Sequence, residues 1–112
     1  MTPLVTQPVS TGSLKIKHTP TQGKLVPEHN QIQINFPNGY SISIVYGGAT
    51  HSTNLNGERF LNSIAETDRA STVEIAILNP QGDFVPFKDG EQVKGFTPIT
   101  ELFTILNWVS TR

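Results

Sequence analysis

Two stretches in which apolar and polar residues alternate lie on either side of a Pro-Asn-Gly tripeptide at residues 37–39. Alternation over residues 31–36 and 40–46 is typical of strands that bury one face. A three-residue loop pairs Ile34 with Ile42 and keeps the apolar side chains of both strands together, whereas a two-residue loop would place a serine opposite that isoleucine. Proline at the first loop position and glycine at the third suit a type I turn followed by a left-handed bulge residue. The sequence therefore predicts a β-hairpin of defined register.

A second Pro-x-Gly turn, at residues 80–82, follows another alternating stretch at residues 72–78. A three-residue loop at this turn predicts a short returning strand over residues 84–87. The pairs that this loop implies are Ile77 with Val85 and Ile75 with Phe87. The proline within the returning strand cannot donate to a ladder, so we expect this strand to lie at an edge or to carry a bulge.

The chain ends in a segment with helical periodicity. Thr97 is predicted to be the N-cap and Pro98 the first helical residue. The apolar positions at helical spacing are Ile99, Leu102, Phe103, Ile105, Leu106 and Val109. A stripe this broad is typical of a helix that packs on a sheet. Trp108 falls on nearly the opposite side, so we expect Trp108, with Ile105 beside it, either to wrap around the helix end or to meet another subunit or a ligand.

These elements predict an α+β fold, in which an antiparallel β-sheet built of hairpins carries a C-terminal α-helix packed on it. We expect one domain over residues 13–112 and a disordered N-terminus over residues 1–12, which are rich in Thr, Pro and Ser. The other expected pieces are a strand at 13–18, an extended piece at 24–26, one or two helical turns over 58–66 and a short strand at 92–96. Connections as long as residues 47–71 are usually mobile or functional.

Composition excludes several classes of function. Eight lysines and arginines spread along the chain, with a net charge of −1, do not predict the basic face of a protein that binds a nucleic-acid polymer. No stretch has the apolar length of a membrane span, and the first residues show no signal-peptide pattern. There is no cysteine, which excludes disulfides and thiolate chemistry. We expect a cytoplasmic protein that binds neither nucleic-acid polymers nor membranes.

Residue patterns for catalysis are absent from the sequence. The sequence has three histidines, His18, His29 and His51. They are far from one another in polar, loop-like contexts and lack the spacing of metal ligands. The carboxylates of the long connection, Glu58, Glu66 and Asp68, are typical of solubility residues. No nucleophile elbow and no phosphate-binding glycine loop is present. We therefore expect no enzymatic activity, no metal and no other cofactor.

Residues suited to ligand binding are more evident. Tyr46, Gly47 and Gly48 end a strand where a ligand can approach the backbone and N–H groups can hold a phosphate. The cations that could pair with that phosphate are Arg59, Arg69, Lys88 and Arg112. Phe84 is the best exposed aromatic residue for stacking on a base, because the derived register points it away from the core.

The polar side of the first hairpin is a second candidate surface. It consists of Gln31, Gln33, Asn35, Ser41 and Ser43, which are uncharged but form hydrogen bonds. A surface of this kind can meet another sheet, a subunit or a neutral part of a ligand.

The order of motifs over residues 35–112 resembles a group of small proteins encoded by tailed bacteriophages. The matching pieces are residues 36–44, 46–48, 73–78, 82–87 and 93–96, before a terminal helix. Among these proteins the chain most resembles the phage Thoeris anti-defence sponges. Residues before this region match no part of that pattern.

The resemblance implies a binding protein of the host cytoplasm that sequesters a cyclic ADP-ribose-type signal without cleaving it and so blocks Thoeris immunity. It also implies a homo-oligomer, a dimer or higher, with the ligand near subunit contacts. On this resemblance Phe84 is the base stacker, and Arg59, Arg69 and Arg112 are phosphate partners. Two alternatives remain open: a protein-binding inhibitor or accessory phage protein without a small-molecule ligand, and an enzyme that degrades a cyclic nucleotide.

Overall fold

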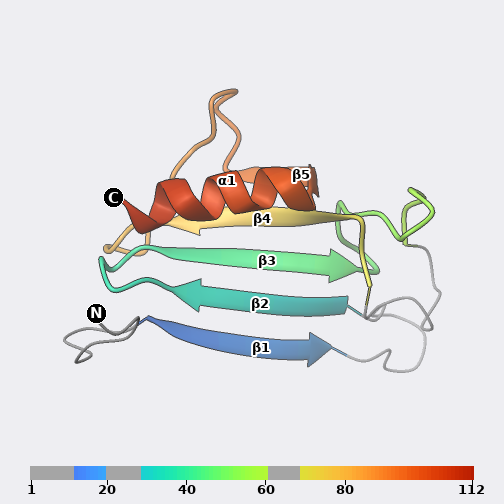
Figure 1. The fold of residues 1–112 in the computed structure, drawn as a ribbon, viewed down its shortest axis with the longest axis horizontal. Helices are drawn as coiled ribbons and strands as arrows, with labels where there is room; N and C mark the ends of the chain where they lie inside the picture. Colours follow the sequence, from blue (N-terminus) through green and yellow to red (C-terminus); the bar gives the residue numbers. More distant parts are fainter. Residues whose placement is uncertain (1–11, 20–28, 61–68) are drawn as a thin grey trace, which may run out of the picture.

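A computed structural model of the chain describes residues 12–19, 29–60 and 69–112. Five strands form one antiparallel sheet in the order β1-β2-β3-β4-β5, and one helix follows them (Figure 1). The elements are β1 (Ser13–Thr19), β2 (His29–Asn35), β3 (Ser41–Gly47), β4 (Thr72–Leu78), β5 (Val93–Pro98) and α1 (Ile99–Ser110). The fold is therefore α+β, as the sequence predicts.

The first hairpin has the predicted register. Ile34 pairs with Ile42, and the N–H of Phe36 donates to the Tyr40 carbonyl over 2.8 Å. Gly39 has φ +90°, the left-handed conformation that the three-residue loop requires. The loop also reaches the helix, because Asn38 Nδ2 donates to the Val109 carbonyl over 2.8 Å. One turn thus fixes the strand register and satisfies a carbonyl group in the last turn of α1.

The second hairpin is only partly as predicted. The N–H of Val85 donates to the Ile77 carbonyl over 2.8 Å, in the expected register. The prediction of a returning strand over residues 84–87 is wrong, because pairing there is limited to an isolated bridge between Leu78 and Phe84. The proline within this segment has no N–H to donate, and residues 87–91 close a further turn through a 2.8 Å bond from the Phe87 N–H to the Glu91 carbonyl. Consequently β5 takes the place beside β4, with Lys94 opposite Ile75.

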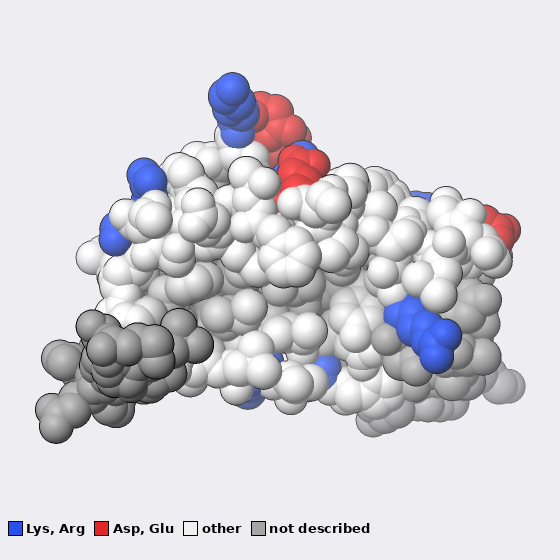
Figure 2. All heavy atoms as spheres, in the orientation of Figure 1, with Lys and Arg blue, Asp and Glu red and all other residues white. Residues whose placement is uncertain are grey.

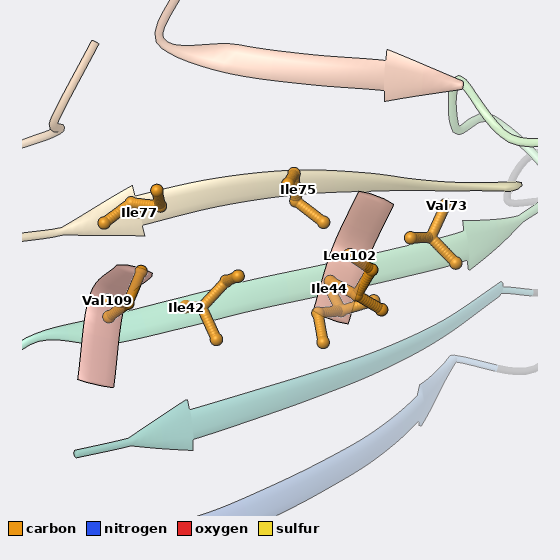
Figure 3. Close-up of a cluster of buried hydrophobic side chains, with 7 residues drawn as sticks. All are labelled: Ile42, Ile44, Val73, Ile75, Ile77, Leu102 and Val109. Carbon is orange, nitrogen blue, oxygen red and sulfur yellow. The ribbon is translucent and has the colours of Figure 1, made fainter. Parts of the chain in front are cut away.

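The core lies between one face of the sheet and the helix (Figure 3). Its buried members come from β3, β4 and α1, and they are Ile42, Ile44, Val73, Ile75, Ile77, Leu102 and Val109. The alternation that predicts the strands places the isoleucines and Val73 on one face of the sheet. The two helical residues are seven positions apart and so lie on one side of α1.

The helix begins later than the sequence predicts. Thr97 belongs to β5, and the N-cap is Pro98, which makes no side-chain capping bond. Thr97 is fully buried and its hydroxyl donates to the Lys94 carbonyl over 3.3 Å, so this side chain stabilises the end of the strand instead. The prediction of Thr97 as the N-cap is therefore wrong by one residue.

The remaining expectations have mixed outcomes. The strands predicted at 13–18 and 92–96 are confirmed as β1 and β5. His18 and His29 lie within strands rather than in loops. Residues 58–60 are not helical, because Arg59 bridges to Thr53. The N-terminus apart from Gly12, the extended piece at 24–26 and the rest of the 58–66 segment lie outside the described residues.

Candidate ligand-binding site

The sheet carries the helix on one face, and within the described residues no second layer of helix or strand covers the other. We call this other face the open face. Because strand residues alternate between faces and the register is known, its side chains can be placed in rows across the sheet. One row reads Lys15, Gln33, Ser43, Ala76 and Val93, each the pairing partner of the next. The rows on either side read Ser13, Asn35, Ser41, Leu78 and Phe84, and Lys17, Gln31, Val45 and Glu74.

A hollow of about 320 Å³ lies on this face over β2, β3 and β4. Its lining contains amide, hydroxyl and apolar side chains and one carboxylate, and it includes Gln31, Gln33, Ser43, Val45, Glu74, Ala76 and Leu78. Phe84 and Val93 form one border and are 46% and 42% exposed. The hollow therefore has an apolar, partly aromatic border beside a polar floor.

The polar floor is pre-organised by hydrogen bonds between its own side chains. Gln31 Nε2 donates to Ser43 Oγ over 3.0 Å, and Gln33 Nε2 donates to Asn35 Oδ1 over 3.0 Å. The Asn35 amide in turn donates to Ser13 Oγ over 2.9 Å. An amide side chain has two N–H donors and an acceptor oxygen. Each residue is thus held in one orientation by part of its hydrogen-bonding capacity.

Positive charge lies at the opposite border. Lys15 and Lys17 are exposed and alternate on β1, so both stand on the open face. Phe84 bridges to the outer side of β4, so four strand spacings, about 19 Å, separate the backbone of β1 from that of Phe84. A flexible lysine reaches several ångströms over the floor. An extended anionic ligand with an aromatic group at one end can therefore contact the lysines, the amides and Phe84 together.

Of the ligand-binding residues predicted around the phosphate and base, Phe84 alone lines this hollow, and it is joined there by Gln31, Gln33 and Ser43 from the polar side of the first hairpin. Lys88, Ile105 and Trp108 line a separate hollow of about 340 Å³ between α1 and the segment 85–88. The Arg112 guanidinium lies 4.2 Å from the centroid of the Trp108 ring. These four residues thus lie together on the helix side of the sheet, away from Phe84.

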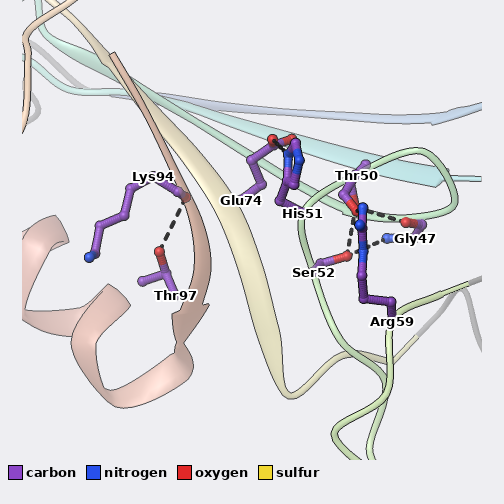
Figure 4. A network of polar contacts seen from close by, with 8 residues as sticks. All are labelled: Gly47, Thr50, His51, Ser52, Arg59, Glu74, Lys94 and Thr97. Carbon is purple, nitrogen blue, oxygen red and sulfur yellow. Dashed lines mark hydrogen bonds and ion pairs between the residues drawn. The ribbon is translucent and has the colours of Figure 1, made fainter. Parts of the chain in front are cut away.

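Gly47, the last residue of β3, and Gly48 lie at the other end of the strands. Both are buried, and Tyr46 packs half-buried against the core on the helix side. The Gly47 N–H donates to Ser52 Oγ over 3.0 Å, and its carbonyl accepts a 2.8 Å bond from Thr50 Oγ1 (Figure 4). The Gly47 amide is therefore already bonded within the protein. The predicted role of this glycine in holding a phosphate would require that bond to open.

The two remaining arginines do not line the hollow of the open face. Arg59 Nη2 donates to the Thr50 carbonyl over 3.3 Å, and its guanidinium lies 5.5 Å from the centroid of the Phe96 ring. Arg69 is exposed at the start of the last described segment. The structure therefore does not bring the predicted arginines and Phe84 together within one chain.

His51 has no role predicted from the sequence, but it makes several contacts in the structure. His51 Nδ1 bonds Glu74 Oε1 over 2.8 Å (Figure 4), and the ring meets Phe96 edge-on with centroids 5.8 Å apart. The Phe96 N–H donates to the His51 carbonyl over 2.8 Å. Phe96 has φ +50°, at an irregularity in the β4–β5 register. The bulge between β4 and β5 thus fixes the position of His51, and His51 in turn fixes Glu74 at one corner of the open face.

Gly95 is required for this arrangement. A Cβ atom on Gly95 would lie 2.6 Å from His51 Cβ, so any side chain must displace the histidine or the strand. We expect Gly95→Ala to lower the free energy of unfolding by about 1–3 kcal/mol, as overpacking does. Urea unfolding of Gly95→Ala, with Gly82→Ala as a control that meets no atom within 4 Å, measures this. Gly82 has φ +84° and Gly95 is not among the glycines with positive φ, so the control includes a backbone strain that Gly95→Ala lacks and sets an upper limit on the cost of adding a Cβ without a clash. Replacing His51 with glycine removes the Cβ atom that the clash involves. If Gly95→Ala costs as much stability in a His51→Gly background as in the native chain, the explanation is contradicted.

The sequence contains part of the information needed to place Lys15 and Lys17 in the candidate site. Their spacing of two places both on one side of a strand. Which side that is, relative to the glutamines, follows only from the pairing of β1 with β2. A single sequence does not reveal that pairing, because no short turn joins the two strands.

Comparisons of the chain with protein-family models, curated proteins and solved structures find no match. Within residues 12–19, 29–60 and 69–112, no group of three or more His, Cys, Asp or Glu side chains is placed to hold a metal ion. In the same ranges, no helix is long and apolar enough to cross a membrane.

Proposed function

We propose that the protein binds a cyclic ADP-ribose-type nucleotide on its open face and sequesters it without cleavage. It thereby acts in the host cytoplasm as a phage anti-defence sponge that withholds the signal from bacterial Thoeris immunity. The observation that supports this most strongly is the order of chemistry across the sheet. Lysines lie at β1, amides and hydroxyls over β2 and β3, and Phe84 beside the end of β4.

Each part of this surface suits one part of such a ligand. A base stacks on Phe84 and Leu78, which adds about 1–3 kcal/mol of binding free energy per aromatic contact. Ribose hydroxyls bond to the Gln31 and Gln33 amides, which are already oriented by Ser43 and Asn35. Phosphates pair with the two lysines of β1. Glu74, the carboxylate that lines the hollow, is bonded to His51, and this carboxylate–imidazole pair at one corner of the face is the group that the enzyme alternative would use.

Sequestration sets a demand on affinity. A sponge must outnumber the signal and hold it with a dissociation constant near or below its own concentration, of the order of 10 nM, which is about −11 kcal/mol. This demand favours a rigid surface over one that folds on binding, and a sheet with hydrogen-bonded side chains is rigid.

The test is titration of the protein with cyclic ADP-ribose and its isomers, with linear ADP-ribose and AMP as controls. We expect a ligand-dependent rise in melting temperature with at least one cyclic nucleotide, and recovery of that nucleotide with unchanged mass after heating. A ligand recovered with the mass of its hydrolysis product would support the enzyme alternative. Absence of any thermal shift with every cyclic nucleotide would contradict the proposal.

A second candidate function, a protein-binding inhibitor, is favoured by the exposure of Trp108 beside an apolar hollow. Exposed aromatic side chains commonly anchor protein interfaces. If this function holds, the protein captures one host protein in stoichiometric amount, and Trp108→Ala abolishes the capture. Capture that survives Trp108→Ala would count against this anchor.

A further inference from the structure

Glu74 is the carboxylate in the lining of the open-face hollow, beside amides that face a ligand carrying phosphates. It also lines a second hollow, of about 580 Å³, together with His51 and Phe96. We call this second hollow the edge hollow, because its lining includes residues 93–96 of β5, the last strand of the sheet. Glu74 and Val93 line both hollows. The carboxylate therefore stands where one hollow meets the other.

One oxygen of this carboxylate is bonded and the other is not. Glu74 Oε1 lies 2.8 Å from His51 Nδ1, and the Glu74 side chain is 17% exposed. Within residues 12–19, 29–60 and 69–112, Oε2 makes no hydrogen bond. An ionised carboxylate accepts hydrogen bonds at both oxygens, and a mostly buried acceptor is costly to leave unbonded. Glu74 is therefore held in one orientation by His51 and keeps its second oxygen for a donor.

The backbone that holds His51 is in an uncommon conformation. Phe96 has φ +50°, in the left-handed region that a bulky side chain rarely adopts, and its N–H donates to the His51 carbonyl over 2.8 Å. Residues in such conformations are concentrated at sites that bind ligands. Here the strained residue fixes the histidine that orients Glu74, so the strain serves the placement of the carboxylate.

The lining beyond Glu74 carries further negative charge. Asp89 and Glu91 line the edge hollow, and its lysine, Lys94, is paired with Glu101 over 3.2 Å. Figure 2 shows acidic side chains (red) on the projecting turn between β4 and β5, beside a basic one (blue). The lysine of that turn, Lys88, lines the hollow on the helix side instead. Phosphates are therefore repelled at this end of the open face and attracted to its β1 border.

We propose that Glu74 makes the site specific for nucleotides with an unmodified ribose. Its free oxygen accepts a hydrogen bond from a ribose hydroxyl, and its charge repels a phosphate on the same hydroxyl. The proposal rests on the proposed function and narrows the ligand to adenosine nucleotides with a free 2′-hydroxyl, excluding the 2′-phosphorylated class. Acidic residues bind ribose hydroxyls in the same way in dinucleotide-binding folds.

The spacing of residues on β4 suits this contact. Glu74 and Leu78 are four residues apart on one strand, so their backbones are about 13 Å apart. Ala76 lies between them on the same face, and its small side chain leaves room for a sugar. A base stacked on Phe84 and Leu78 can thus direct its ribose along β4, toward the carboxylate.

Calorimetric titration with cyclic ADP-ribose, its 2′-deoxy analogue and its 2′-phosphate tests the proposal. We expect the native protein to bind the 2′-deoxy analogue about tenfold more weakly, because one charge-assisted hydrogen bond is lost. The 2′-phosphate should bind at least about 100-fold more weakly, because like charges meet. In Glu74→Gln, which keeps the shape and removes the charge, the penalty for the 2′-phosphate should fall below about tenfold. The control is Glu58→Gln, since Glu58 is exposed and lines neither hollow.

His51 is a positioning residue in this arrangement, and two variants of equal shape test that role. His51→Asn retains a donor near the place of Nδ1, whereas His51→Leu does not. We expect His51→Leu to lose several-fold of the preference for the 2′-hydroxyl and His51→Asn to keep most of it. Equal preferences in the two variants would show that the histidine is structural only and would contradict its role in orienting Glu74.

The outcomes separate this proposal from the proposed function. Equal binding of all three nucleotides by the native protein, or a 2′-phosphate penalty that survives Glu74→Gln, would overturn the specificity and leave sequestration intact. Failure of all three to bind would overturn the specificity as well, while isomers of cyclic ADP-ribose still test sequestration. Cleavage of cyclic ADP-ribose by the native protein but not by Glu74→Gln would assign the carboxylate to catalysis and overturn both.

Discussion

Replacing Ile75 with alanine is expected to lower the free energy of unfolding by about 3–4 kcal/mol, which is much of the stability of a domain of this size. Ile75 is 1% exposed and lies at the centre of the core, opposite Ile44 on β3 and beneath the helix. Because neighbouring strands fix the backbone on both sides, the cavity collapses little, and the cost lies in the upper part of the range for such truncations.

Urea unfolding followed by circular dichroism measures this loss. The matched control is Leu55→Ala, which removes a similar side chain from a position that is 62% exposed. We expect the control to change the free energy of unfolding by less than about 0.5 kcal/mol. Equal losses in the two variants would show that the core does not lie between β3, β4 and α1.

The parts of the fold that the sequence predicts well are those fixed by local chemistry. Pro37 and Gly39 determine a three-residue turn, and alternation on each side then sets the register of β2 and β3. The same reasoning gives the bond from Val85 to Ile77. It fails beyond Pro86, because a competing turn removes residues 87–91 from the ladder. The pairing of β4 with β5 therefore depends on tertiary contacts, which no turn motif predicts.

The site is less predictable than the fold for the same reason. The open face joins lysines on β1 to Phe84, and these residues are about seventy positions apart in the sequence. Alternation reveals which residues share a side of one strand, but not which strands are neighbours. The His51 bond to Glu74 depends on a bulge between β4 and β5, which single-sequence patterns do not show. Charge alone predicts the arginines as phosphate partners, but no arginine lines the hollow that contains Phe84.

The second large expected effect concerns ligand affinity. Phe84→Ala should weaken binding of the cyclic nucleotide about 5- to 150-fold, the equivalent of 1–3 kcal/mol for a lost stacking contact. The matched control is Phe103→Ala, because Phe103 is also an exposed phenylalanine, at 66% against 46% for Phe84, but lies on α1 and outside the hollow. We expect unchanged affinity for that variant in calorimetric titrations.

The lysines of β1 should act through charge rather than stacking. Lys15→Ala and Lys17→Ala should each weaken binding about tenfold, because each removes a charge-assisted contact to a phosphate. The double variant should also flatten the dependence of the dissociation constant on salt, since fewer ion pairs remain to be screened. Lys94→Ala, whose ammonium pairs with Glu101 over 3.2 Å, is the control for loss of one positive charge. If Lys94→Ala weakens binding and flattens the salt dependence as much as either β1 variant, the nucleotide does not lie across the open face.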